Sequence, residues 1–371
     1  MKVIFYIGHH KVGSTALQAF LTRNWRRLAK NGTLYPAVES RGFAANLARA
    51  LGQPGEGDAG DVNIREPHSA LAYKMMSEVS ARKVPPQFKR LPAAGQMLLA
   101  IQNQVRSIRP DNLVLCSEAF ANFGEVDTGL IETLAKTFPK ASFEIYCALR
   151  RPDEYLISWH GQRLKVGEKV QALSAGGAEA YFNNIHFNFR SVVEPWVTHL
   201  PGARLILRSY ADILAAGGSE QDFMDQTGLE LAGKAAPPAG RQANLSLPRA
   251  AMEIVRRANH ELPPEQAHAL SQFLLKGEGL TPAPNRDVEM FGAPLRALLA
   301  ERFAPVHDYL SGLAGKPFFA DYAGLTETLP IPEAQATAAL LEQIDPDTLP
   351  RPEPWPELGA YLAGLRREMA A

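Results

Sequence analysis

Residues 2–28, KVIFYIGHHKVGSTALQAFLTRNWRRL, decide the fold of this chain. Lys2–Ile7 is a short apolar run of β-branched and aromatic residues, which predicts a buried strand at the centre of a parallel sheet. Gly8 and Gly13 then bracket a tight turn. The spacing of apolar residues predicts a helix over 16–30, because they fall on one helical face. A strand, a glycine turn and a helix N-terminus together form a cradle for an anion, since free N–H groups and the helix dipole favour negative charge there.

The spacing inside the turn separates this loop from a nucleoside triphosphate loop. Such a loop reads G-x-x-x-x-G-K-[ST], with the lysine directly after the second glycine. Here Ser14 takes that place and the lysine lies inside the turn as Lys11, while Ser14 or Thr15 is expected to cap the helix. Kinases need a lysine and a metal to neutralise several phosphate charges. A sulfuryl group carries less charge, so one lysine could serve without a metal. The alternative is a glycine turn that holds no ligand.

Length and composition allow one large α/β domain with an appendage. The chain has 371 residues, of which 46% are hydrophobic, as in ordinary globular proteins. We expect a main domain over 1–320 and a Pro/Ala-rich helical extension over 321–371 packed on it. Lys and Arg together number 39, as do Asp and Glu, so bulk charge gives no argument for a nucleic-acid or membrane partner.

The cysteines and the first residues point to a reducing compartment. Cys116 and Cys147 lie in separate apolar runs, which predicts buried thiols rather than a disulfide framework or a zinc site. The first apolar run is too short for a signal peptide and meets His9 and His10 at once. No run reaches membrane-spanning length. A cytoplasmic protein without a metal site or membrane span is therefore expected.

A second strand is predicted over 112–120, with Ser117 and Glu118 at its carboxyl end. In open α/β sheets, ligands bind at the carboxyl ends of the strands. A carboxylate placed there can act as a general base for an acceptor hydroxyl. The alternative is that Glu118 caps a helix or belongs to a salt bridge.

A third strand, Phe143–Leu149, leads directly into Arg150-Arg151-Pro152 and, further on, Ser158. An arginine at a strand end offers a fork of donors to a phosphate. Pro152 suits the first turn of a following helix, which would carry Ser158 about two turns along. Without a partner motif, these arginines could equally cap and solvate the helix.

Together, these stretches resemble bacterial sulfotransferases that use 3′-phosphoadenosine 5′-phosphosulfate (PAPS). Residues 9–36, HHKVGSTALQAFLTRNWRRLAKNGTLYP, are similar to the opening of those enzymes, in which a K-[TS]-G-[ST]-T loop holds the 5′-phosphosulfate. Arg150 and Ser158 have the spacing of the family's R-x-P-x-x-x-x-x-S motif, whose Arg and Ser bind the 3′-phosphate. Glu118 matches the glutamate of a Ser-Ser-Glu sequence in the bacterial relatives. Arg241 begins a similar R-x-N-x-S-L run, although it does not match the Arg-Lys-Gly segment that covers the nucleotide in the animal enzymes.

The resemblance implies a P-loop-like, three-layer α/β fold with a central parallel sheet flanked by helices, plus the helical C-terminal extension. It also implies transfer of a sulfuryl group from PAPS to a hydroxyl or amine, with carbohydrate as the acceptor by family analogy. Lys11 would stabilise the leaving group and Glu118 would take the acceptor proton. The cofactor-binding residues would be Lys11, Val12, Gly13, Ser14, Thr15, Arg150, Ser158 and Arg241, with no metal required.

Two other functions remain open from the sequence. One is a P-loop kinase-like phosphotransferase, against which the displaced Lys11 and the lack of an evident metal-binding Asp at a strand end both count. The other is a non-catalytic nucleotide-binding module, because fold does not guarantee activity. If Glu118 is not the base, the next candidates are His9, His10 and His160. Neither the acceptor nor the oligomeric state can be read from the sequence.

Overall fold

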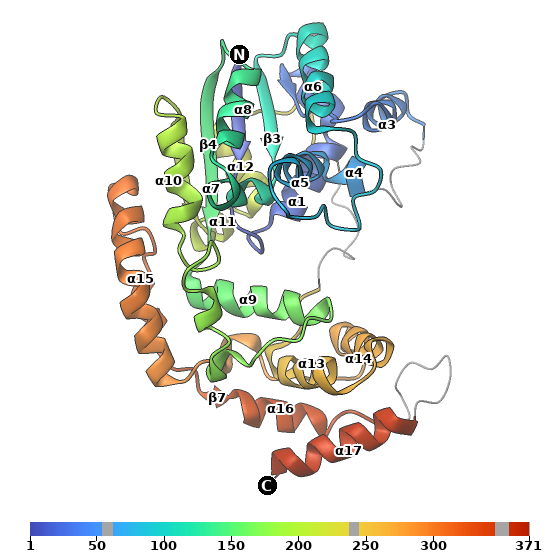
Figure 1. Cartoon of the computed structure of the whole chain (residues 1–371), viewed down its shortest axis with the longest axis vertical. Coiled ribbons are helices and arrows are strands. Elements are labelled where there is room, and N and C mark those ends of the chain that lie inside the picture. The colour runs from blue at the N-terminus through green and yellow to red at the C-terminus, as the bar shows by residue number, and fades with distance from the viewer. Residues whose placement is uncertain (54–61, 237–244, 346–355, 371) are drawn as a thin grey trace. The chain divides into compact units, whose positions relative to one another are not determined.

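A computed structural model describes residues 1–53, 62–236, 245–345 and 356–370 (Figure 1). Its internal contacts group the chain into two compact units, and each unit is built from separate stretches of sequence. Unit 1 comprises residues 1–150, 188–241 and 308–318, and unit 2 comprises residues 151–187, 242–307 and 319–371. The predicted boundary between residues 320 and 321 stays a prediction.

Unit 1 is built on a five-stranded parallel sheet with the order β2-β3-β1-β4-β5. Its strands are β1 (Lys2–Tyr6), β2 (Thr33–Leu34), β3 (Asn112–Cys116), β4 (Ser142–Leu149) and β5 (Arg204–Ser209). The predicted α/β fold with a central parallel sheet is confirmed. As expected, β1 is the middle strand, paired with β3 on one side and β4 on the other.

Successive side chains of β1 point to opposite faces of the sheet, as in any strand. Ile4 and Tyr6 pack with Leu17 of α1 and Phe223 of α12 on one face. Phe5 packs against the rings of Phe120, Phe143 and Trp196 on the other. Helices therefore cover both faces, which is the predicted three-layer arrangement.

Helices connect and flank the strands of unit 1. They are α1 (Ser14–Arg23), α2 (Trp25–Lys30), α3 (Ser40–Ala50), α4 (Val62–Arg65), α5 (Pro67–Val79), α6 (Ala94–Ile108), the short 3₁₀ helix η2 (Glu118–Asn122), α7 (Phe123–Val126), α8 (Gly129–Thr137), α10 (Arg190–His199), α11 (Tyr210–Ala215) and α12 (Ser219–Thr227).

The single helix predicted over 16–30 is wrong, because the chain forms α1 and α2 with a break at Asn24. Asn24 is fully buried, and its side-chain amide donates to the Phe20 carbonyl (3.0 Å). Its side-chain oxygen accepts from the Ala236 N–H (2.9 Å). A buried asparagine that needs both bonds holds the chain in a bend rather than letting the helix continue.

Unit 2 is mainly helical. It contains α9 (Pro152–Lys165), η3 (Leu173–Ala175), η4 (Glu179–Tyr181), α13 (Arg249–Glu261), α14 (Pro264–Lys276), η5 (Asn285–Asp287), β6 (Val288–Glu289), η6 (Tyr322–Thr326), β7 (Ile331–Pro332), α16 (Glu333–Leu341) and α17 (Pro356–Ala370). α15 (Ala293–Ala314) belongs to unit 2 as far as His307. α13 packs on α9, α14 and α16, and α16 contacts α17, so the part of the chain beyond residue 320 carries the predicted helices.

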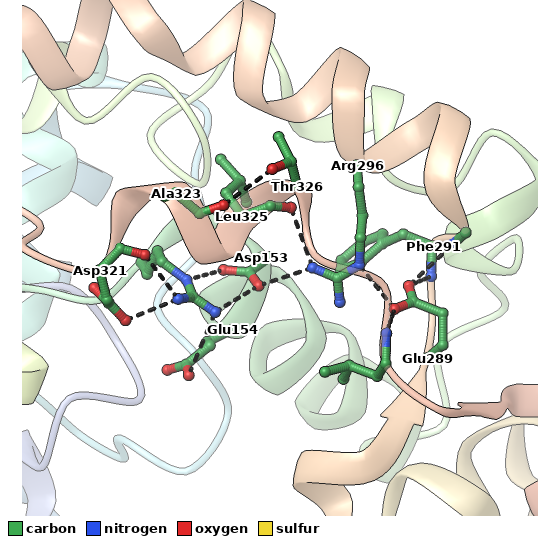
Figure 2. Close-up of polar contacts among 12 residues, drawn as sticks. Asp153, Glu154, Glu289, Phe291, Arg296, Asp321, Ala323, Leu325 and Thr326 are labelled. Atoms are coloured by element: carbon green, nitrogen blue, oxygen red, sulfur yellow. Dashed lines mark hydrogen bonds and ion pairs between the residues drawn. The ribbon is translucent and has the colours of Figure 1, made fainter.

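A buried ion-pair network joins three parts of unit 2 (Figure 2). The Arg296 guanidinium, with a side chain only 2% exposed, contacts Glu289 Oε2 (2.7 Å) and Asp153 Oδ2 (3.3 Å). Asp153 also receives two bonds from Arg151, through Nε (2.8 Å) and Nη2 (3.0 Å). Arg151 in turn contacts Asp321 (2.8 Å). The network ties the start of α9 to α15 and to the segment around η6.

Within the described residues, no helix combines the length and the apolar character that a membrane span requires. Cys116 and Cys147 are buried free thiols on β3 and β4, as predicted.

Candidate functional site

The loop between β1 and α1 turns by means of two residues in the left-handed region, Lys11 (φ 62°) and Gly13 (φ 87°). A Cβ at Gly13 would lie 1.9 Å from the Ser219 hydroxyl oxygen, so only glycine fits there. A Cβ at Gly8 would lie 2.9 Å from the backbone nitrogen of Ala148 on β4. Gly13 is thus required by its left-handed backbone and by the nearby Ser219, and Gly8 is required by the close approach of β4.

α12 supports the loop from one side. The Ser219 hydroxyl, at the first position of α12, donates to the Val12 carbonyl (3.2 Å). α12 is itself anchored to the sheet through Asp222, which is fully buried and accepts from Arg208 on β5 (Nη2···Oδ1 2.6 Å). The Tyr146 hydroxyl of β4 also donates to Asp222. These charged, buried hydrogen bonds hold α12 in one position, and α12 in turn contacts the loop.

The helix that follows the loop begins at Ser14, with Gly13 as its N-cap, and no side chain caps it. The prediction that Ser14 or Thr15 caps the helix is therefore wrong: both lie in its first turn, because Gly13 takes the cap position. A first turn without a side-chain cap leaves backbone N–H groups to be satisfied by water or by an anion. This is the donor set that the loop sequence predicted.

Glu118 lies just beyond β3, directly beside the loop, with its side chain 14% exposed. Its Oε2 accepts a hydrogen bond from the Gln18 amide of α1 (2.8 Å), and its Oε1 lies 3.7 Å from His10 Nδ1. The N-cap of η2 is Ser117, whose hydroxyl accepts from the Ala119 N–H (3.0 Å). Helix capping is thus performed by Ser117, and Glu118 is held by an amide and an imidazole.

The electrostatics of this corner favour a neutral imidazole. Burial lowers the pKa of His10, the neighbouring Lys11 lowers it further, and only Glu118 opposes the shift. A second carboxyl, Glu66, precedes α5; burial first, and then the Glu118 charge, raise its pKa to about 7, against the opposing effect of Arg65. The Glu118 charge therefore acts on a second carboxyl group, that of Glu66.

Arg150 directly follows β4, and its guanidinium lies over the ring of Tyr210, 5.1 Å from the centroid. This stacking orients the guanidinium by its flat face. Arg151, in unit 2, instead forms ion pairs with Asp153 and Asp321. The two adjacent arginines thus have different surroundings, and Arg150 is the one that stacks on an aromatic ring.

The structure does not test the remaining predicted residues. Ser158 lies on α9 in unit 2, partly buried, so its pairing with Arg150 of unit 1 stays a prediction. Arg241 lies outside the described residues.

The three histidines that the sequence left as candidates differ in position. His9 is fully buried, with the ring of Phe189 edge-on at 4.3 Å. His160 belongs to unit 2 and is buried, which, with the nearby Arg163, lowers its pKa to about 4. His10 is therefore the histidine that adjoins Glu118.

No protein-family model and no curated protein matches this chain. Among solved structures, it is similar to the crystal structure of a sulfotransferase from Alicyclobacillus acidocaldarius, with 12% sequence identity and a TM-score of 0.40. The match covers 86% of this chain and 98% of that one. At this identity and TM-score, the likeness carries no argument about activity.

Sequence reasoning missed the residues that hold the site in shape: Gln18, Ser219 and Tyr210. Gln18 had a signal, since it lies on the same helical face as the apolar Leu17 and Leu21 and is only 1% exposed. A buried amide on an apolar face needs partners, and here one partner is Glu118. Ser219 and Tyr210 gave no such signal, because they lie about two hundred residues from the loop and in ordinary helix-start sequences.

Proposed function

We propose that the chain is a sulfotransferase that moves a sulfuryl group from PAPS to a hydroxyl or amine of an acceptor. The observation that supports the proposal is that the Lys11 loop and Glu118 follow neighbouring parallel strands at their carboxyl ends. Lys11 follows β1, Glu118 follows β3, and these strands are paired in register. Lys11's neighbour His10 and the α1 residue Gln18 both contact Glu118. A cation in an anion-binding loop beside a carboxylate suits transfer of an anionic group to a proton-bearing acceptor.

In the loop, backbone N–H groups bind the phosphate, and Lys11 stabilises the charge of the leaving group. The backbone N–H groups of residues 12–15 hold the 5′-phosphate, at the uncapped first turn of α1. Lys11 interacts with the bridging oxygen and stabilises the negative charge that develops there as the bond to sulfur breaks. PAPS itself supplies the activated sulfuryl group.

Glu118 acts on the acceptor. An ionised carboxylate is a weak base toward a free alcohol, but it accepts the proton as the new oxygen–sulfur bond forms and the hydroxyl becomes acidic. The bond from Gln18 fixes the orientation of the carboxylate without neutralising it, because the amide carries no charge.

The 3′-phosphate is bound by Arg150 and Ser158, and Arg241 covers the nucleotide. Support for Arg150 comes from its place at the end of β4 and from the Tyr210 ring that orients it. Support for Ser158 and Arg241 comes from the sequence motifs alone.

A screen of acceptors with ³⁵S-labelled PAPS tests the proposal. The acceptors are desulfated oligosaccharides, simple alcohols and amines, each assayed with a metal chelator present. The same panel with γ-labelled ATP and Mg²⁺ is the control for a phosphotransferase. We expect label transfer from PAPS in chelator, with carbohydrates as the best acceptors, and none from ATP. Transfer from ATP only would establish the kinase alternative and refute the proposal.

A further inference from the structure

A cavity of about 470 Å³ lies at the other end of α1 from the loop. It falls within the range of volumes of small-molecule sites. Its walls come from the last turn of α1, from α2 and from α3, all in unit 1. Arg23, the last residue of α1, is nine positions after Ser14, about 14 Å along the helix at 1.5 Å per residue. The cavity contains no residue of the β1–α1 loop.

The lining of this cavity is strongly basic. Its described lining residues include five cationic side chains and no carboxylate: Arg23, Arg26, Arg27, Lys30 and Arg49. The chain as a whole is electrically balanced, with 39 basic and 39 acidic residues. A concave surface with one sign of charge focuses its potential and attracts ligands of opposite sign.

Within the described part of the chain, three of these cations take part in no ion pair. Among the described residues, none of the ion pairs involves Arg23, Arg27 or Lys30, whereas most other buried or half-buried arginines contact a carboxylate. Arg26 donates to a backbone carbonyl, that of Ala50 (2.9 Å). A structural role would be expected to supply counter-charges, because like charges placed together repel.

Two buried donors of the lining also lack acceptors. The Nε of Arg23 and the indole Nε1 of Trp25 are shielded from water and have no hydrogen-bond partner among the described residues. A buried donor without an acceptor destabilises the folded chain, because it has lost its bond to water without replacement. Small adjustments of these side chains toward an anionic oxygen in the cavity would relieve that cost.

We infer that this cavity binds a small polyanion bearing several sulfate or phosphate groups. Arg23 ends α1, Arg26, Arg27 and Lys30 belong to α2, and Arg49 belongs to α3, so cations line the cavity from three helices. Cations on several walls fit several anionic groups rather than one. Arginine forks bind sulfate and phosphate oxygens in pairs, and the Trp25 ring offers a flat surface to a sugar or cyclitol. The inference does not depend on the activity proposed for the loop.

Calorimetric titration of the full chain at low salt tests the inference with two probes of the same chemistry, sucrose octasulfate and inositol hexakisphosphate. Sucrose and inorganic sulfate are the neutral and single-anion controls. The cavity variant is the double substitution Arg23→Gln and Arg27→Gln. Its matched control is Arg106→Gln with Lys140→Gln, which removes the same charge from exposed positions outside the cavity.

We expect at least one probe to bind, with about tenfold or greater weakening in the cavity variant, equivalent to about 1.4 kcal/mol. The charge-matched control should bind within about twofold of wild type, and added salt should weaken binding because the lining is exposed to screening. The tighter of the two probes then identifies the source as a sulfated sugar or a polyphosphate.

Three outcomes would overturn the inference. The first is that neither probe binds, or that the cavity variant binds both as wild type does. The second is that inorganic sulfate competes for the cavity as effectively as the probes do, when they are compared at equal total charge. That result would mean an adventitious ion only. The third is loss of binding in Lys11→Ala but not in the cavity variant, which would place the probes in the loop.

Discussion

Two clusters around acidic side chains, one in each unit, differ in the kind of partner that each carboxylate has. In unit 2, Arg296 lies between Glu289 and Asp153 and is almost completely buried (Figure 2). Glu289 also accepts from the backbone N–H groups of Phe291, Gly292 and Leu329. Every charge in that cluster faces an opposite charge or a set of dipoles.

In unit 1, the partners of Glu118 are an amide and an imidazole whose pKa is lowered by burial. Neither is a fixed cation, and the carboxylate keeps part of its surface exposed. The comparison teaches that removing one member of a buried pair of opposite charges destabilises the fold. A carboxylate held only by neutral groups stays available for chemistry. Substitutions in the two clusters should accordingly affect different measurements.

The largest expected effect is on stability, from Arg296→Met. Removing the guanidinium leaves Asp153 and Glu289 buried without their shared cation, and breaking a buried pair in this way costs about 3–5 kcal/mol. The free energy of unfolding in denaturant measures the loss. Arg286→Met, at a side chain 88% exposed, is the matched control and should change it by less than about 0.5 kcal/mol. Near-normal stability of Arg296→Met would mean that the cluster is not structural.

Lys11→Ala should act on turnover instead. The loss of one preorganised charge-stabilising group lowers the rate by about a hundredfold to a thousandfold. The melting temperature should change little, because the left-handed backbone of residue 11 is equally strained with alanine. Lys83→Ala, an exposed lysine elsewhere in unit 1, is the control. If Lys11→Ala turns over like wild type, Lys11 is not the catalytic lysine.

Glu118→Gln should lower turnover by roughly a hundredfold, the scale of general-base removal, with nucleotide affinity unchanged. The glutamine keeps the shape of the side chain and can still accept from Gln18. Glu230→Gln, an exposed glutamate in unit 1, controls for the loss of charge. A Glu118→Gln enzyme that is less stable but fully active would end the base assignment and move it to the adjacent His10.

The smallest effect is a pH dependence of stability from His68, which packs beneath the same corner. Burial lowers its pKa to about 3, its Nδ1 accepts from the Cys116 N–H (3.1 Å) and its Nε2 lies 3.1 Å from the Pro36 carbonyl. Because the folded pKa is depressed, this contribution to stability is present above the unfolded pKa and is lost as the pH falls.

Between pH 7 and pH 5, wild type should therefore lose about 2 kcal/mol more than His68→Gln, since protons bind the unfolded chain from about pH 6.5 downward. Unfolding free energies of both proteins at the two pH values measure the difference. Equal losses would show that His68 titrates normally in the folded state.

The fold was largely predictable because its signals are local. The apolar strands β1, β3 and β4 and the loop glycines each carry their pattern within a few residues, although β3 ends at Cys116 rather than at the predicted residue 120, because a 3₁₀ helix begins at Glu118. The break at Asn24 was not predictable, since it depends on a bond to Ala236, far along the chain. The contact between Gln18 and Glu118 likewise joins residues a hundred positions apart. The residues proposed for chemistry could be named from sequence, whereas the partners of the residues that position them, such as that of Gln18, could not.

The most direct test of the account is the binding of two nucleotides that differ by one group, since it requires no knowledge of the acceptor. Adenosine 3′,5′-bisphosphate should bind and raise the melting temperature, because a ligand that binds only the folded state stabilises it. Adenosine 5′-phosphate, which lacks the 3′-phosphate assigned to Arg150 and Ser158, should bind much more weakly. Equal binding of the two would contradict those assignments, and binding of neither would contradict the assignment of the loop as a site for 3′-phosphoadenosine nucleotides.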